Sequence, residues 1–334
     1  MNLYKIGITH GDINGIGYEV IIKSLSDNKI LELCKPIVYG LAKVSSFHRK
    51  ALNFNDFSFQ FIKDAEQPSL KKANLINLQD EEVKVDLGES TQIAGKMAEL
   101  SIAAACKDLK NNRIDALVTA PINKFNIQSE TFDFVGHTEY LSHYFNSQKT
   151  MMMMVAEQLK VGFVTNHVPI HDLENVITKE LISNKIDIFH HSLINDFACT
   201  NPKIAVLSLN PHAGDNNLLG TEETEMIKPA ISEAFENKIN VFGPFPCDSF
   251  FGAGEYTKYD GILAMYHDQG MTPFKLLAMD NGVNFTAGLP VVRTSPAHGI
   301  AYQLAGKNKA SHSSFRNAIY LAIDILNNRL ALKE

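Results

Sequence analysis

The feature that most constrains the fold of this chain is a repeated alternation of short apolar segments with longer segments of helical periodicity. The apolar segments are near-continuous rather than alternating, which is typical of strands covered on both faces. These expected strands are 5–9, 36–40, 116–119, 150–155, 161–165, 204–209 and 261–265. The expected helices are 90–109, 173–197, 222–236 and 315–330. Strands that alternate with helices predict an α/β architecture with a largely parallel sheet.

The length of the chain, 334 residues, sets the expected number of domains. Single hydrophobic cores stop growing at about 250–300 residues, so we expect two domains or one large α/β unit. No internal repeat and no Pro/Gly/Ser-rich linker marks a boundary, so we expect the chain to cross between domains near 119–125 and 265–271. The polar segment 63–86 is expected to be a loop with short strands that could pair antiparallel.

Charge and cysteine content argue against several classes of function. The 31 Lys and Arg against 37 Asp and Glu give a formal net charge of −6 without a basic run, so we expect no nucleic-acid partner. The four cysteines are scattered, which fits a reducing cytosol better than a disulfide framework. We find no membrane-span or secretion-signal pattern and expect a cytoplasmic protein without a membrane partner. The apolar run 151–156 is interpreted as a buried strand.

A glycine-rich turn follows the first expected strand and contains Gly11, Gly15 and Gly17. Its spacing, Gly-x₃-Gly-x-Gly, differs from the Gly-x-Gly-x-x-Gly of dinucleotide-binding folds, and segment 36–40 ends without the carboxylate that would bind a ribose. The sequence therefore argues against that fold. Two readings stay open: glycines that allow a tight turn and close helix packing, or a turn whose backbone N–H groups bind a ligand.

Twelve histidines against four cysteines leave an imidazole-based metal site open. Four histidines directly or nearly follow apolar, strand-like segments: His137, His167, His212 and His267. Ligands of open parallel sheets bind outside the carboxyl ends of the strands, so these side chains could converge. Three imidazoles with an open coordination position suit Zn²⁺ or a similar divalent ion, with Asp268 as a further partner. The alternative is that each histidine is an ordinary, satisfied loop residue.

Single polar residues within apolar segments suggest that the chain binds an anion. Lys275, Asn284 and Arg293 are of this kind, and Lys124 follows another expected strand. A cation in apolar surroundings needs a partner, which a bound carboxylate or phosphate can supply. An internal salt bridge is the alternative. With the histidines, the pattern suggests a small, doubly anionic substrate bound next to a metal.

A series of motifs along nearly the whole chain resembles the 4-hydroxythreonine-4-phosphate dehydrogenase family of the vitamin B6 pathway. The motifs are Thr-Ala-Pro-Ile-Asn-Lys at 119–124, Gly-His-Thr-Glu at 136–139, Met-Met-Met-Met-Val-Ala at 151–156, Asn-His-Val-Pro at 166–169, Asn-Pro-His-Ala-Gly at 210–214, Gly-Thr-Glu-Glu at 220–223, Ala-Met-Tyr-His-Asp-Gln-Gly at 264–270, Gly-Val-Asn-Phe-Thr-Ala-Gly-Leu-Pro at 282–290, Arg-Thr-Ser at 293–295, His-Gly at 298–299 and Ala-Gly-Lys at 305–307. Together these motifs are highly specific, although none is so alone.

The resemblance implies a two-domain fold like that of isocitrate and isopropylmalate dehydrogenases, with the active site in the cleft between domains at a dimer interface. We expect a discontinuous first domain of 1–125 with 268–334. A second domain of 126–267 would carry the interface of a homodimer whose active sites are shared between subunits.

The resemblance also implies roles for individual residues. His167, His212 and His267 match the metal ligands of the family, one of them contributed by the partner chain. The matching substrate-binding residues are His137, Thr138, Lys275, Asn284 and Arg293. The matching cofactor-side residues are His298, Gly299 and Gly306. The chain departs from the family mainly in the glycine-rich turn, at His10, Ile13 and Tyr18.

The implied reaction is NAD(P)-linked oxidation of 4-phosphooxy-L-threonine at C3, followed by decarboxylation to 3-amino-2-oxopropyl phosphate. The cofactors would be NAD or NADP and a divalent metal such as Zn²⁺, Co²⁺ or Mg²⁺. Asp248 and Asp268 are the candidates for proton transfer. The alternatives are the same chemistry on 4-phospho-D-threonate or 4-phospho-D-erythronate, a metal-dependent hydrolase using the same histidines, and a non-catalytic phosphometabolite binder.

Overall fold

The structure, a computed structural model, describes residues 3–157 and 159–333, which form two compact units. The described parts of Met1–Gln148 and Leu289–Leu326 form unit 1, and those of Lys149–Gly288 and Asn327–Glu334 form unit 2. The chain therefore crosses between units about twenty residues later than the sequence indicates at both positions.

Packing explains why both crossings lie later in the chain. Residues 126–148 belong to unit 1 because Phe132, Tyr140 and Leu141 are buried in the same core cluster as residues of the strand β2 (Cys34–Gly40) and the helix α4 (Gln92–Lys110). Residues 268–288 belong to unit 2 because this segment forms most of a helix that packs on its sheet and a strand that pairs within it. Neither contact is visible as a hydrophobic period in the sequence.

The sheet of unit 1 is parallel throughout and has the strand order β3-β4-β2-β1-β5-β12. Its strands are β1 (Tyr4–Thr9), β2 (Cys34–Gly40), β3 (Gln60–Ile62), β4 (Asn74–Asn77), β5 (Ala116–Thr119) and β12 (Val292–Pro296). Short strands occur here as expected, but the antiparallel pairing considered for segment 63–86 is not formed, because β4 lies parallel to both β2 and β3. The loop between β3 and β4 is long enough to return the chain to the same end of the sheet.

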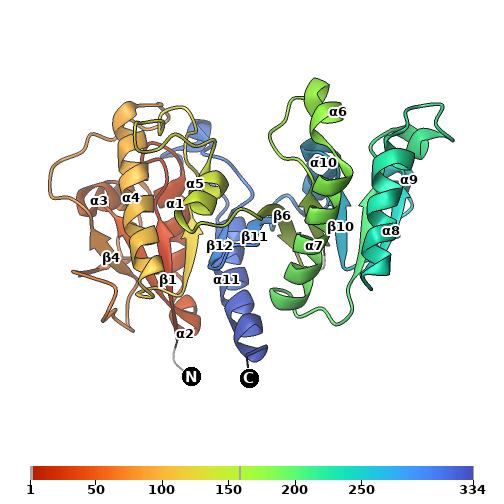
Figure 1. Cartoon of the computed structure of the whole chain (residues 1–334). Helices are drawn as coiled ribbons and strands as arrows, with labels where there is room; N and C mark the ends of the chain where they lie inside the picture. The colour runs from red at the N-terminus through yellow and green to blue at the C-terminus, as the bar shows by residue number, and fades with distance from the viewer. Residues whose placement is uncertain (1–2, 158, 334) are drawn as a thin grey trace. The chain divides into compact units, whose positions relative to one another are not determined.

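Unit 1 also contains several helices (Figure 1). They are α1 (Gly17–Leu25), α2 (Ile30–Leu33), α3 (Ala42–Ala51), α4 (Gln92–Lys110), α5 (His137–Tyr144) and the part of α11 (Ser313–Ala331) up to residue 326. The long helix α4 packs on β1, β2 and β5. It begins at Thr91, whose hydroxyl accepts a hydrogen bond from the Ala94 N–H (3.3 Å), an N-cap interaction worth about 1 kcal/mol.

The sheet of unit 2 is mixed and has the strand order β11-β6-β7-β10-β8-β9. Its strands are β6 (Met151–Ala156), β7 (Leu159–Phe163), β8 (Lys203–Leu207), β9 (Asn240–Phe245), β10 (Gly261–Ala264) and β11 (Val283–Ala287). Strands β7, β10, β8 and β9 are parallel, whereas β6 is antiparallel to both neighbours. The interpretation of 151–156 as a buried strand is confirmed, since all six residues are buried.

Helices of unit 2 include α6 (Leu173–Val176), α7 (Lys179–Asn195), the π-helical turn Glu223–Ile227, α8 (Lys228–Glu236), α9 (Cys247–Gly252) and α10 (His267–Ala278). The expected helix 173–197 is split, because Ile177 and Thr178 are extended and the Thr178 hydroxyl caps α7 by accepting from the Leu181 N–H (3.1 Å). Across the described residues, no helix combines the length and apolarity needed to cross a membrane.

The residues that depart from the family pattern in the glycine-rich turn form one packed cluster. The His10 ring stacks on Tyr18 (5.2 Å between centroids), and Tyr18 stacks on His48 (5.1 Å). The Nε2–H of His48 donates to the Ile13 carbonyl (2.8 Å), and the Nδ1–H of His10 donates to the Gly11 carbonyl (2.7 Å). The rings of His10, Tyr18 and His48 are buried and contact one another, so the residues that depart from the family pattern pack together and depend on each other.

Burial of His10 and His48 predicts that the chain loses stability in mild acid. Desolvation lowers the pKa of each imidazole to about 4, below the value near 6.5 of an unfolded chain. The unfolded state therefore binds more protons between these values, and stability present above pH 6.5 is lost as the pH falls toward 4. Between pH 7.5 and 5 we expect a loss of about 2 kcal/mol per histidine.

Urea unfolding followed by far-UV circular dichroism measures this loss. His48→Gln keeps a donor near the Ile13 carbonyl but does not titrate, so its stability difference between pH 7.5 and 5 should be smaller than that of the wild type. Equal pH dependence in the two proteins would contradict the assignment.

Candidate active site

Three of the candidate histidines follow the carboxyl ends of adjacent parallel strands in unit 2. His167 lies beyond β7, His267 is the first residue of α10 and follows the end of β10 by three positions, and His212 lies beyond β8. The strand β10 pairs with β7 on one side and with β8 on the other, both in parallel. Carboxyl ends of neighbouring parallel strands share one edge of a sheet, which is where ligands bind. The sheet therefore brings three segments, far apart in sequence, to one edge.

Hydrogen bonds fix these strand ends to one another. The Thr165 hydroxyl and N–H both donate to the Met265 carbonyl (2.8 and 3.2 Å), which joins the segments before His167 and His267. The buried Gln269 side chain accepts from the Met265 N–H (2.7 Å) and donates to the Ser208 carbonyl (2.5 Å). Gln269 thereby links the end of β10 to the end of β8.

The structure brings two of the three histidines together. The rings of His167 and His267 have centroids 6.0 Å apart, and both side chains are accessible to solvent. The Nδ1–H of His267 donates to Asp268 Oδ1 (2.6 Å), because a carboxylate can only accept. This bond leaves Nε2 of His267 as the nitrogen available to a metal, an arrangement typical of metal-binding histidines.

His212 lies on an exposed turn of unusual backbone geometry. Six consecutive residues, 212–217, have positive φ, from 40° at Asp215 to 79° at Gly214. Gly, Asn and Asp adopt this left-handed conformation readily, whereas His212 and Ala213 pay roughly 1–2 kcal/mol each. Among residues 3–157 and 159–333, no group of three or more His, Cys, Asp or Glu side chains is placed to hold a metal. The structure thus does not bring His212 to the other two histidines.

The chemistry of this donor set fits a divalent metal. Two imidazoles beside each other, one oriented by a carboxylate, are ligands for Zn²⁺ or Co²⁺. Imidazole is a less suitable ligand for Mg²⁺, which prefers oxygen. Two side chains of the described chain supply part of a coordination sphere, and further ligands are required to complete it.

Arg293 of unit 1 is the buried cation of the anion-binding set. It lies on β12 with 3% of its surface exposed, and its Nε and Nη2 both donate to the Thr119 hydroxyl (3.1 and 2.7 Å). Burial lowers the pKa of the guanidinium to about 10, opposed by the nearby Glu139 carboxylate, so the group stays charged at neutral pH. A guanidinium forms strong, charge-assisted hydrogen bonds with carboxylate and phosphate groups, so Arg293 has the chemistry to bind an anion.

His137 lies near the same cation, at the start of α5. Burial and the positive charges of Arg293 and Lys124 hold the pKa of His137 well below its usual range, so the imidazole is neutral. The expectation that His137 follows a strand is wrong, because 132–135 is irregular and packs as an aromatic cluster. The adjacent Thr138 also lies in the first turn of α5, where its carbonyl accepts from the Ser142 hydroxyl (2.7 Å).

The remaining predicted polar residues have different environments. Lys275 is exposed on α10, so the argument that it is a cation in apolar surroundings is wrong: the helix places it on the solvent side. Asn284 is half-buried on β11, and its Oδ1 has no hydrogen-bond partner among the described atoms. Asp248 is exposed in the first turn of α9.

The glycine-rich turn uses its N–H groups within the protein. The N–H groups of Asp12, Asn14, Gly15 and Ile16 donate to protein acceptors. A Cβ on Gly11 would lie 2.2 Å from the Pro121 carbonyl oxygen, and one on Gly15 would lie 2.3 Å from the Ile300 side chain. The glycines therefore allow a tight turn and close packing, which is the first of the two interpretations, and these four N–H groups are not available to a ligand.

The turn also anchors the segment that carries the cofactor-side residues. The buried Asp12 carboxylate accepts from the Tyr302 hydroxyl (2.8 Å) and from the Asn126 amide (2.8 Å), while Ile16 N–H donates to the Ile300 carbonyl. Neither Asp12 nor Tyr302 is among the site residues expected from the sequence. They are 290 positions apart, so no local pattern connects them.

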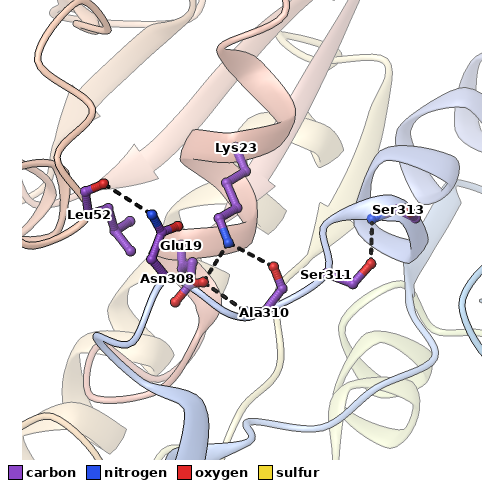
Figure 2. Close-up of polar contacts among 7 residues, drawn as sticks. All are labelled: Glu19, Lys23, Leu52, Asn308, Ala310, Ser311 and Ser313. Atoms are coloured by element: carbon purple, nitrogen blue, oxygen red, sulfur yellow. Dashed lines mark hydrogen bonds and ion pairs between the residues drawn. The ribbon is translucent and has the colours of Figure 1, made fainter.

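A second anchor lies on α1 (Figure 2). Lys23 and Glu19 form an ion pair (2.7 Å); Glu19 accepts from the Ala310 N–H (2.8 Å), and Lys23 donates to the Ala310 carbonyl (2.9 Å). The pair thus binds both backbone groups of one residue. Asn308 donates to the Leu52 carbonyl (3.4 Å) and fastens the same segment to the end of α3.

The three predicted cofactor-side residues lie close to these anchors in the sequence: His298 and Gly299 directly precede Ile300, and Gly306 lies between Tyr302 and Asn308. His298 is half-buried with Nδ1–H donating to the Gly299 carbonyl (3.0 Å), and its Nε2 has no partner among the described atoms. A Cβ on Gly299 would meet nothing within 4 Å, so the space beside it is open. Gly306 needs to be glycine, because its φ is 71° and a Cβ would lie 2.5 Å from Leu87.

The chain is similar to known proteins over nearly its whole length. The family model described as "Pyridoxal phosphate biosynthetic protein PdxA" matches residues 32–322. A 4-hydroxythreonine-4-phosphate dehydrogenase of Bacteroides thetaiotaomicron is 52% identical over 98% of this chain and 90% of its own. A protein of Oceanobacillus iheyensis named "Putative D-threonate 4-phosphate dehydrogenase" is 39% identical over 96% of this chain and 97% of its own.

Solved structures agree with this likeness. The crystal structure of 4-hydroxythreonine-4-phosphate dehydrogenase from Klebsiella pneumoniae has a TM-score of 0.83 and 34% identity, and the match covers 98% of this chain and 99% of that one. Isocitrate dehydrogenase from Methylococcus capsulatus has a TM-score of 0.50 at 10% identity, over 99% and 88% of the two chains. The second match concerns the fold alone, and it confirms the expected α/β fold of the isocitrate dehydrogenase type.

The electrostatic environment of His137 yields a test within unit 1. Because the positive charge of Lys124 lowers the pKa of His137, Lys124→Gln should raise that pKa. Added inorganic phosphate should raise it too, since a bound anion favours the imidazolium. Both are measured by NMR titration of the His137 ring. The exposed Lys43→Gln on α3 serves as a control that should change nothing, and an unchanged pKa in Lys124→Gln would disprove the proposed field.

Proposed function

The chain belongs to the pyridoxal phosphate biosynthetic protein PdxA family, and on this premise we propose that it is a metal-dependent dehydrogenase of 4-phosphooxy-L-threonine. The reaction oxidises the C3 hydroxyl and transfers its hydride to NAD⁺ or NADP⁺. The resulting β-keto acid loses CO₂ and gives 3-amino-2-oxopropyl phosphate, a precursor of pyridoxine 5′-phosphate. The observation that carries the proposal is the pair His167 and His267, 6.0 Å apart at the ends of adjacent parallel strands.

His167, His212 and His267 are the residues proposed to hold the metal, which is Zn²⁺, Co²⁺ or Mg²⁺, with the imidazole donors favouring the first two. When bound, such an ion supplies Lewis-acid stabilisation of negative charge on a substrate oxygen. Asp268 orients His267 through its 2.6 Å hydrogen bond. Asp248 is proposed to take part in proton transfer, and Asp268 is the second candidate. Because two histidines of one chain lie together, we propose that a partner subunit completes the ligand set in a homodimer.

The phosphate and carboxylate of the substrate are proposed to be bound by Arg293, His137, Thr138, Lys275 and Asn284. Arg293 provides a buried permanent charge that does not need to be desolvated on binding. Neutral His137 can donate or accept a hydrogen bond without adding charge. Lys275 is exposed and hydrated, so its contribution is that of a mobile point charge. These contacts would orient the reacting carbon.

The nicotinamide cofactor accepts the hydride. His298, Gly299 and Gly306 are proposed to contact it, with NAD and NADP both open as the form used. The open space beside Gly299 and the anchors at Tyr302 and Ala310 support this assignment, because they hold the segment in place around room for a ligand. We propose that the reaction takes place in the cytoplasm, where nicotinamide cofactors and phosphorylated metabolites are found.

A substrate panel tests the proposal. Purified protein with Zn²⁺ or Co²⁺ and 4-phosphooxy-L-threonine should reduce NAD⁺ or NADP⁺, seen as absorbance at the nicotinamide band. Replacing His267 with Ala should lower kcat by about 10²–10³-fold through the loss of charge stabilisation. A metal-loaded, folded sample that reduces neither cofactor with any 4-phosphorylated hydroxy acid would exclude a dehydrogenase.

The related substrate 4-phospho-D-threonate is included in the panel because a relative that is 39% identical carries its name. A higher kcat/KM for that compound, or for 4-phospho-D-erythronate, would show that the protein carries out the same chemistry on that substrate instead of on 4-phosphooxy-L-threonine. Phosphate release without cofactor reduction would instead indicate the metal-dependent hydrolase.

The Asp12–Tyr302 hydrogen bond predicts a defect on the cofactor side. Tyr302→Phe leaves the buried carboxylate short of one donor, which should cost about 1.5–3 kcal/mol of stability. A less well-fixed segment should raise KM for NAD(P)⁺ more than it lowers kcat. Tyr320→Phe, at a half-buried tyrosine on α11, is the control. A cofactor KM equal to that of the wild type would show that Tyr302 does not act on cofactor binding.

A further inference from the structure

The turn that carries His212 needs an external support. All of residues 212–217 have positive φ. The backbone hydrogen bonds of the turn run from Asp215 N–H to the His212 carbonyl (3.2 Å), from Leu218 N–H to the Asp215 carbonyl (3.2 Å) and from Leu219 N–H to the Gly214 carbonyl (3.0 Å). His212 and Ala213 have side chains that disfavour this conformation. Strained backbone persists where its surroundings over-determine it, so a neighbouring group must hold the turn.

Glu223 is that group. Its side chain is 1% exposed, and its Oε1 accepts from the N–H groups of Leu209 (2.8 Å) and Asn210 (2.7 Å), at the end of β8. Its Oε2 accepts from the Asn210 side-chain amide (3.0 Å). One buried carboxylate therefore binds three donors on the two residues that precede Pro211 and His212.

Neighbouring contacts attach the same turn to the same helix. The Glu222 carboxylate also accepts from the Asn210 amide (2.7 Å), and the Thr224 hydroxyl donates to Asn217 Oδ1 at the far end of the turn (2.7 Å). A Cβ on Gly214 would lie 2.8 Å from Glu223 Oε2, so the turn passes close over the carboxylate. The Gly-Thr-Glu-Glu segment at 220–223 thus packs beneath the loop it follows.

We propose that Glu223 is the positioning residue for His212: it fixes both the start and the hand of the turn, and so sets where the imidazole is presented. This inference rests on the proposed function, in which His212 binds the metal. Without the carboxylate, the backbone N–H groups of Leu209 and Asn210 lose their acceptor, and the turn is free to relax to right-handed geometry. His212 would then sample positions away from the metal, and the metal would bind more weakly.

Cobalt titration of the whole protein by calorimetry tests the proposal. Glu223→Gln keeps the shape and one acceptor oxygen but turns a donor toward the Asn210 amide, so it should weaken Co²⁺ binding about 10–100-fold, as for other changes around metal ligands. At saturating Co²⁺, kcat should return close to the wild-type value. A general loss of structure would instead lower kcat even when the metal site is saturated. Glu225→Gln on the same helix, exposed and outside this network, should bind Co²⁺ as the wild type does.

Amide hydrogen exchange at Leu209 and Asn210 gives the second readout, with faster exchange expected in Glu223→Gln. If that variant does not fold, Thr224→Val provides the milder test, with weaker Co²⁺ binding expected again. Wild-type-like Co²⁺ affinity in the folded variant would overturn the role of Glu223. A wild type that binds no Co²⁺, or one whose affinity is unchanged by His212→Ala, would instead remove the proposed metal function on which the inference rests.

Discussion

The parallel pairing of β7, β10 and β8 is the constraint on which the candidate metal site depends. It places the ends of three strands on one edge of the unit 2 sheet, and the residues beyond these ends include His167, His267 and His212. The buried side chain of Gln269 joins two of these ends by hydrogen bonds. Because these strands are hydrogen-bonded to one another, the segments that carry His167 and His267 lie side by side before any ligand arrives, whereas His212 also depends on the conformation of its turn.

Unit 1 achieves similar rigidity with buried polar groups. Asp12 is buried, and it is satisfied by donors from distant segments instead of by a cation. The ion pair of Glu19 and Lys23 binds a backbone segment in the same way. Hydrogen bonds in such networks are stronger in a buried environment than in water, so they favour one arrangement of the surrounding loops. The buried charge of Arg293 lies on a strand of the same unit, which suits it to bind an anion without rearrangement.

Much of the fold could be predicted from the sequence, because continuous apolar segments are typical of buried strands. The antiparallel direction of β6 was also within reach, since the connection to β7 is too short for a parallel crossover. The site was predictable in part: strand ends indicated His167, His212 and His267, whereas the resemblance supplied their proposed roles. Lys275 was misjudged because α10 places it in solvent. The Asp12–Tyr302 contact and the support of the His212 turn by Glu223 are tertiary hydrogen bonds without a local signature.

The central claim is that the imidazoles of His167, His212 and His267 form the metal site. X-ray absorption spectroscopy of the cobalt-loaded protein tests it most directly. The account predicts nitrogen or oxygen ligands at about 2.0–2.1 Å with the multiple-scattering pattern of several imidazoles, reduced in His267→Ala. A shell of oxygen ligands without imidazole scattering, unchanged by that substitution, would contradict it.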